Sequence, residues 1–162
     1  MRNKEYQSID CGAGGNCFFH AISRGLEEYN IIRSYVELRK MVSDWFCDAS
    51  NAELFRHVFG TTPNEIVPHL GHMAHHCPSK EGWAAYTRNW NWQDWGKYLS
   101  HDGRWAGGLE IRAMNLCFQL FDIPNTVNIW KKDIQFLCED KLDSMTILLM
   151  LNNNHFTLLK QI

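Results

Sequence analysis

The chain has 162 residues, of which 45% are hydrophobic and 21% are charged, and its formal net charge is −2. This length supports one hydrophobic core, so we expect a single globular domain over residues 1–162. The composition excludes an intrinsically disordered chain, and the lack of a lysine or arginine run argues against nucleic acid or an anionic membrane as a partner.

The cysteines and the apolar segments predict the compartment. Six cysteines are scattered without paired spacing, at positions 11, 17, 47, 77, 117 and 138. A core of this size needs no disulfide bonds. Residues 1–10 hold no apolar stretch of signal-peptide length, and the apolar run 145–151 is too short to cross a bilayer. We therefore expect a soluble cytosolic protein with reduced thiols.

The first half of the chain predicts helices. After Cys17, apolar residues recur at intervals of three and four, which indicates a helix that ends between residues 25 and 30. The same spacing predicts a second helix over residues 31–46, with Ile32 on its apolar face. A further helix is expected after a cap at Ser50 or Asn51, and a short one from Pro63.

The second half predicts helices followed by strands. Residues 81–99 are rich in aromatic side chains and fit one helix or a broken pair, and residues 109–121 fit a helix that ends before a proline turn. The segments 126–130, 145–151 and 155–160 fit strands, the last two as a hairpin with an asparagine-rich turn. This order, helices and then a small sheet, predicts an α+β domain.

The stretch GAGGNCFFHAIS, residues 12–23, suggests a reactive thiol. Asn16 is a favoured N-cap, which makes Cys17 the first helical residue and predicts that the helix dipole stabilises its thiolate. Gly14 and Gly15 can turn backbone N–H groups toward an oxyanion. The alternative is that Cys17 is a small buried residue beside a tight turn.

An acyl-transfer enzyme also needs a base, and His155 is the best candidate among eight histidines. It follows an asparagine turn at the start of the last predicted strand, and a strand holds a side chain rigidly. The alternative is an ordinary surface turn residue.

Three blocks, GGNCFFHAIS (14–23), WAGGLEIRAM (105–114) and NHFTLL (154–159), together resemble the signature motifs of the ovarian tumour (OTU) family of cysteine proteases. Most active members of that family are deubiquitinases. The resemblance implies a papain-like α+β fold with a small central sheet between helices and a nucleophile at a helix N-terminus. It further implies Cys17 as nucleophile and His155 as general acid and base.

The resemblance also implies an oxyanion loop formed by Gly14, Gly15 and Asn16, no cofactor, and ubiquitin, ubiquitin chains or a ubiquitin-like protein as partner. Two positions in these blocks depart from the family pattern. Gly14 stands where the family has aspartate, and Ala106 stands where it has glycine, although the step from Trp105 to Glu110 is kept.

The third departure concerns the residue that orients the histidine. Thr157 occupies the position where many members have asparagine or aspartate. Because side chains alternate along a strand, Thr157 shares a face with His155, and its hydroxyl can orient the ring. Asp10, one of the asparagines at 152, 153 and 154, or a bare Cys–His dyad are alternatives.

The sequence also holds a cluster of histidines with a cysteine and a cluster of tryptophans. His72, His75, His76 and Cys77 are dense enough to suggest zinc, but no second ligand cluster accompanies them, so we expect no metal site. The tryptophans at 83, 90, 92, 95 and 105 either cover a small core or form a partner surface.

The sequence thus predicts a monomeric deubiquitinase that cleaves ubiquitin or a ubiquitin-like modifier from substrates. A catalytically silent modifier-binding module, or a papain-like protease acting on another polypeptide, is the alternative. The expected location is the cytosol, which is that of a host cell if the protein is a bacterial effector or a viral protein.

Overall fold

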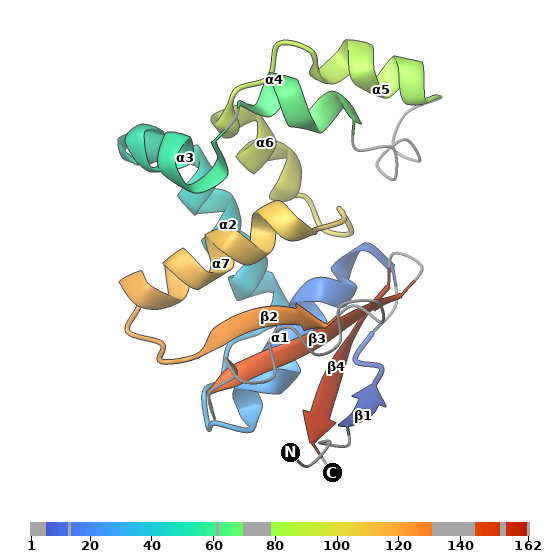
Figure 1. Ribbon diagram of the computed structural model, residues 1–162, viewed down its shortest axis with the longest axis vertical. Coiled ribbons are helices and arrows are strands. Elements are labelled where there is room, and N and C mark those ends of the chain that lie inside the picture. Colours follow the sequence, from blue (N-terminus) through green and yellow to red (C-terminus); the bar gives the residue numbers. More distant parts are fainter. Residues whose placement is uncertain are drawn as a thin grey trace.

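The computed structural model describes residues 6–12, 14–60, 62–69, 79–130, 145–152 and 155–161. It confirms the α+β prediction, because a four-stranded sheet packs against helices (Figure 1). The strands are β1 (Tyr6–Ile9), β2 (Thr126–Trp130), β3 (Thr146–Asn152) and β4 (His155–Gln161).

The helices confirm most of the predicted segments. They are α1 (Cys17–Glu27), α2 (Tyr35–Cys47), α3 (Ala52–Phe59), α4 (Pro63–Ile66), α5 (Lys80–Thr87), α6 (Trp92–Leu99) and α7 (Gly108–Leu120). Short 3-10 turns span Gly14–Asn16, Ala49–Asn51 and Val67–His69. The aromatic segment is the broken pair of helices α5 and α6.

The predicted start of the second helix was wrong. Helix α2 begins after Ser34, whose hydroxyl accepts a hydrogen bond from Glu37 N at 3.1 Å. This cap satisfies a backbone donor that a helix start leaves unpaired. Ile32, expected on the apolar face, therefore lies before the helix and is 79% exposed.

The sheet is mixed, with strand order β1-β4-β3-β2. Strands β3 and β4 are antiparallel with Asn152 opposite His155, which confirms the predicted hairpin, while residues 153–154 lie outside the described chain. Strand β2 pairs with β3 in parallel, and β1 pairs with β4 antiparallel. The sequence analysis did not predict β1, a four-residue strand that is largely open to solvent.

Two close contacts hold helices α1 and α7 against the sheet. Gly25 of α1 lies so close to the sheet that a Cβ there would be 2.7 Å from Ile147 Cγ2. At the other edge, Asn115 of α7 donates from Nδ2 to Val127 O at 3.1 Å and accepts from Val127 N at 2.7 Å. Asn115 thus satisfies backbone groups of β2, which is an edge strand.

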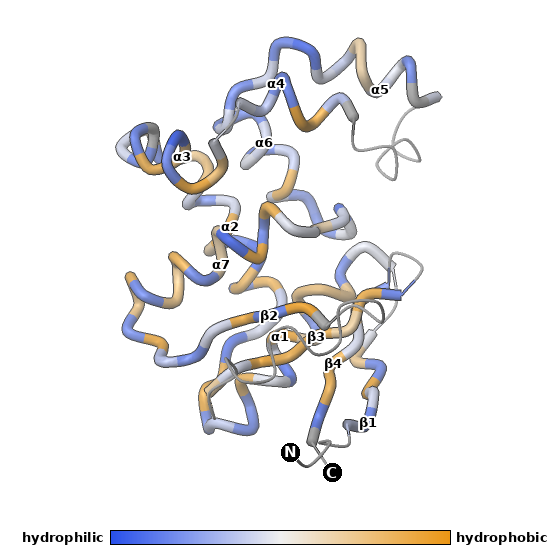
Figure 2. Tube along the Cα trace, in the orientation of Figure 1, coloured by the Kyte–Doolittle hydropathy of each residue, from blue (hydrophilic) through white to orange (hydrophobic). Residues whose placement is uncertain are grey.

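Hydrophobic residues run along β2, β3 and β4 (Figure 2) and continue into the helical part of the molecule. Trp83, Trp92 and Trp95 are buried there, and Trp90 and Trp105 pack against them as partly buried residues. The tryptophan cluster therefore covers the core, as the first alternative held. Within the described ranges, no helix has the length and apolar character needed to cross a membrane.

A buried carboxyl group holds the start of α7. Glu110 is 2% exposed, and its Oε1 accepts from Gly107 N at 2.6 Å while Oε2 accepts from Trp95 Nε1 at 2.9 Å. Burial raises the pKa of Glu110 to about 7, although both hydrogen bonds oppose that shift. Glu110, five residues after Trp105 in the motif, thus links α6 with the start of α7.

This carboxyl group makes the stability of the fold depend on pH. Because the folded pKa of Glu110 lies above the unfolded value, its contribution is complete below about pH 4.5 and is lost as the pH rises to about 7. The expected loss is about 3 kcal/mol of unfolding free energy. Urea unfolding between pH 4.5 and 8 measures it. In Glu110→Gln this part of the slope should vanish, and an identical slope in both proteins would contradict the assignment.

Candidate active site

Cys17 and the segment of His155 meet where α1 packs on β4. Cys17 is the first residue of α1 and is 1% exposed. Its Sγ accepts a hydrogen bond from Phe156 N at 3.4 Å, and Phe156 follows His155 directly in β4. Two segments separated by 138 residues in the chain (17 and 155) are therefore neighbours in space.

The histidine is oriented by an aspartate. His155 Nε2 lies 3.2 Å from Asp10 Oδ1, and the same oxygen accepts from Gly12 N at 3.1 Å. The His155 side chain is 30% exposed and that of Asp10 is 67% exposed. Since this contact uses Nε2, Nδ1 is the ring nitrogen suited to exchange a proton with a thiol.

Thr157 has a different partner from the one expected. It lies on the face of β4 opposite to buried Phe156, as predicted, but its Oγ1 accepts from Ser8 Oγ of β1 at 2.8 Å. The structure therefore brings Asp10, and not Thr157, to the His155 ring. Among the asparagine alternatives, Asn152 lies opposite His155 in the hairpin register, whereas 153 and 154 fall outside the described residues.

The predicted effect of the helix start on the thiol was wrong. Burial raises the pKa of Cys17 above its ordinary value. Backbone N–H groups of Phe156, Phe18 and Cys17 itself lower the pKa, but they do not offset the loss of solvent, and the charge of Asp10 adds to the rise. The resting form at neutral pH is thus the thiol, and a nearby base must take its proton.

The glycine loop forms a 3-10 turn directly before α1. Gly14 has φ +77°, a conformation that favours glycine. Gly15 packs so closely on the loop at Gly103 that a Cβ would be 1.5 Å from Gly103 O. The role of this loop in binding an oxyanion stays a prediction.

Asn16 occupies the predicted N-cap position but does not cap the helix with its side chain. Its Oδ1 accepts from Arg39 Nη2 at 2.6 Å and from Gly103 N at 2.9 Å, while its Nδ2 donates to Asp102 Oδ1 at 3.2 Å. The side chain thus joins the loop before Cys17 to two other segments.

Arg39 is the residue near the site that sequence reasoning missed. It lies on α2, is 3% exposed, and contacts the loop through Gly15 O and Asn16. A signal was present, because Arg39 shares the buried stripe of α2 with Val42 and Phe46 at intervals of three and four. A charged residue on an apolar stripe indicates a buried ion with specific acceptors.

Within the part of the chain that the structure describes, no group of three or more histidine, cysteine or acidic residues is placed to hold a metal ion. The cluster of His72, His75, His76 and Cys77 lies outside that part. The residues that can carry out nucleophilic catalysis here are a thiol, an imidazole and a carboxylate, which belong to Cys17, His155 and Asp10.

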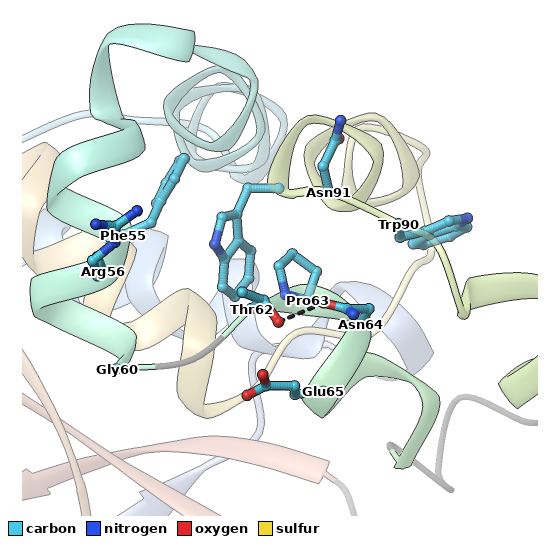
Figure 3. A pocket seen from close by; sticks show the side chains of 10 residues that line it. Phe55, Arg56, Gly60, Thr62, Pro63, Asn64, Glu65, Trp90 and Asn91 are labelled. Atoms are coloured by element: carbon cyan, nitrogen blue, oxygen red, sulfur yellow. Dashed lines mark hydrogen bonds between the residues drawn. The ribbon is translucent and has the colours of Figure 1, made fainter.

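A surface cleft lies elsewhere, among the helices α3, α4 and α6 (Figure 3). It encloses about 470 Å³ and has Phe55, Pro63 and Trp92 on its walls. Neither Cys17 nor His155 lines it. The candidate active site is therefore separate from this cleft.

Comparison with solved structures identifies the fold. An OTU deubiquitinase from Wolbachia pipientis wMel bound to ubiquitin matches with a TM-score of 0.61 and 12% identity over 96% of both chains. The viral OTU domain protease of Dera Ghazi Khan virus matches with a TM-score of 0.57 and 13% identity, over 97% of this chain and 81% of that one.

A third structure, an OTU domain in complex with ubiquitin, has a TM-score of 0.57 and 17% identity, over 96% of this chain and 70% of its own. No protein-family model matches the sequence, and no curated protein matches it. The chain has the OTU fold, which confirms the fold expected from the three sequence blocks.

The state of the thiol predicts how Cys17 reacts with a small electrophile. Because only the thiolate attacks iodoacetamide and burial raises the pKa of Cys17, its alkylation rate should rise about tenfold per pH unit from pH 6.5 to past 8.5. Mass spectrometry of the Cys17 peptide follows the rate. A plateau below pH 7 would show a preformed thiolate and contradict the burial argument.

Proposed function

We propose that the protein is a cysteine-type deubiquitinase that removes ubiquitin or a ubiquitin-like modifier. The observation that carries the proposal is the hydrogen bond from Phe156 N to Cys17 Sγ, because Phe156 directly follows His155 in β4. The Asp10 contact with the His155 ring supports it. The OTU fold shared with ubiquitin-bound structures supports ubiquitin as the partner.

The first half of the reaction forms a thioester. His155 takes the proton of the Cys17 thiol, and the sulfur attacks the carbonyl carbon at the C-terminal glycine of the modifier. The negative charge on the carbonyl oxygen is bound by N–H groups of the loop from Gly14 to Cys17. The C–N bond then breaks, and protonated His155 gives its proton to the leaving amine.

The second half regenerates the enzyme. Water attacks the thioester with His155 as base, the C–S bond breaks, and the thiol recovers its proton. Asp10 holds the ring so that Nε2 stays occupied and Nδ1 serves in both proton transfers. Since the Asp10 carboxylate is largely exposed, its contribution is smaller than that of a buried orienting group.

The burial of Cys17 places a condition on this cycle. Because the side chain is 1% exposed, a substrate reaches the sulfur only after the residues that cover Cys17 move. Binding of the modifier tail would supply the free energy for this step.

One observation favours a second candidate, a modifier-binding module without activity. The sulfur is shielded, and burial keeps it as a thiol. Such a module would bind the modifier equally well after Cys17→Ala and would cleave nothing. A papain-like protease for another polypeptide would react with general thiol electrophiles and would not react with ubiquitin.

The proposal also includes that the protein is a monomer and acts in the cytosol. The free thiols of Cys11, Cys47 and Cys117 are consistent with a reducing compartment.

A ubiquitin probe with a C-terminal electrophile tests the proposal. The expected result is one adduct of ubiquitin mass on Cys17, because the bound tail delivers the electrophile to the sulfur. Cys17→Ala should give no adduct and His155→Ala should slow its formation by about 100-fold or more, within the range for loss of a general base. Intact-mass spectrometry and peptide mapping measure both.

The matched control is Cys47→Ala, which removes a thiol at the end of α2 and should label like the wild type. Asp10→Asn should give an intermediate rate. Folded wild-type protein that forms no adduct with ubiquitin or its relatives would contradict the proposed activity. Binding of unmodified ubiquitin without any adduct would support the silent module instead.

A further inference from the structure

We infer that Arg39 is a positioning residue of the candidate active site, which fixes the loop before the nucleophile so that its backbone N–H groups point toward the reacting carbonyl. This inference rests on the proposed function for its catalytic consequence. The structural part, that Arg39 holds the loop, stands independently of the substrate. It assigns a role to a buried charge on α2 that the Cys–His–Asp chemistry does not use.

A single guanidinium joins three segments. Its Nη2 donates to Gly15 O at 3.2 Å, to Asn16 Oδ1 at 2.6 Å and to Arg104 O at 2.8 Å, and its Nη1 donates to Leu99 O at 2.8 Å. The acceptors belong to the loop before Cys17, the end of α6 and the loop that leads to α7. Arg39 is thus the shared hydrogen-bond donor of these segments.

The bond to Gly15 O has a direct geometric consequence. A peptide unit is planar, so the carbonyl of Gly15 and the N–H of Asn16 belong to one rigid group and point in opposite directions. When Arg39 fixes the carbonyl toward the interior, the N–H of Asn16 is fixed toward the other side of the loop. A peptide group whose carbonyl oxygen accepts from a cation is also polarised, which makes its N–H a stronger hydrogen-bond donor.

Asn16 provides a second attachment for the same loop. Its side chain accepts from Gly103 N at 2.9 Å and donates to Asp102 at 3.2 Å, in addition to the bond from Arg39. The close contact of Gly15 with Gly103 O leaves no room for the loop to shift sideways. Together these contacts hold the backbone on the N-terminal side of Cys17.

Burying the Arg39 guanidinium costs desolvation free energy, which argues for a specific role of this side chain. The side chain is 3% exposed, its Nε has no hydrogen-bond partner among the described residues, and it lies over the Phe19 ring at 4.5 Å. Desolvation lowers the pKa of Arg39, and the charges of Asp102 and Glu110 offset part of that shift. A buried apolar residue would avoid this penalty but would take a hydrogen-bond donor away from four oxygen acceptors.

Lysine cannot replace this arrangement. The guanidinium presents a rigid planar fork, and two of its nitrogens serve four acceptors here, whereas an ammonium group is a single point with three donors. We therefore expect Arg39→Lys to preserve the charge and lose the geometry. Lys40→Met is the matched control, because Lys40 is the next residue of α2 and pairs with Asp44 at the surface.

Amide hydrogen exchange followed by NMR tests the structural part. In Arg39→Lys, exchange at residues 15–17 should become about tenfold or more faster, as expected for the loss of charge-assisted hydrogen bonds, while β3 and β4 keep their protection. Lys40→Met should exchange like the wild type. If Arg39→Lys does not fold, Asn16→Ala, which removes one acceptor of Arg39, should show the same increase. Unchanged exchange at residues 15–17 in the folded variant would overturn the inference.

Two rates test the catalytic part. For a ubiquitin substrate with a fluorescent leaving group, Arg39→Lys should lower kcat by about 10- to 100-fold and leave KM within about threefold, because the loop acts on the transition state. Alkylation of Cys17 by iodoacetamide builds no oxyanion and should change less than about threefold. Equal loss in both rates would indicate general disruption and contradict the positioning role.

The failure of the proposed function is distinguishable from the failure of this inference. If the wild type cleaves no ubiquitin substrate, the proposed activity fails, and the exchange measurement still decides whether Arg39 holds the loop. If the wild type is active and kcat is unchanged in Arg39→Lys, the activity stands and the positioning role falls.

Discussion

The hydrogen bond from Phe156 N to Cys17 Sγ is the contact on which the rest of the site depends. It exists because α1 packs directly on the β3–β4 hairpin, with Gly25 close to Ile147 and the ring of Phe156 edge-on to Phe18 at 5.2 Å between centroids. The buried apolar residues of α1 and β4 thus supply the free energy that holds a helix start beside a strand start. Helix and strand ends meet as a consequence of core packing.

That packing also explains the electrostatics of the molecule. The same burial that aligns the segments removes water from Cys17, Arg39 and Glu110. It raises the pKa of Cys17 and Glu110 and lowers that of Arg39, which in each case favours the neutral form. The effect of burial on the charge differs among the three groups. Glu110 is largely protonated below about pH 7, Arg39 keeps its charge through four oxygen acceptors, and Cys17 stays a thiol that needs His155 as base. A single core thereby sets both stability and reactivity.

The sequence predicted what depends on local spacing. The N-cap position of Asn16 and the helical intervals after Cys17 placed the start of α1 correctly, and two apolar runs around an asparagine turn placed the β3–β4 hairpin. Partners that are distant in the chain were missed or were predicted only as one alternative among several. The Asp10 contact with His155 spans 145 residues, and the bonds of Arg39 reach 23 to 65 residues along the chain. The pKa of Cys17 was misjudged because desolvation by the surrounding core outweighs the backbone N–H groups that favour the thiolate.

The central claim is that His155 exchanges a proton with the Cys17 sulfur, with Asp10 orienting the ring. A crystal structure of the protein trapped on an electrophilic ubiquitin tail tests it most directly. The account predicts an adduct on Cys17 Sγ, the His155 Nδ1 atom within hydrogen-bonding distance of that sulfur, and Nε2 still paired with Asp10. An adduct on Cys17 with the His155 ring turned away from the sulfur, and another group in its place, would contradict the account.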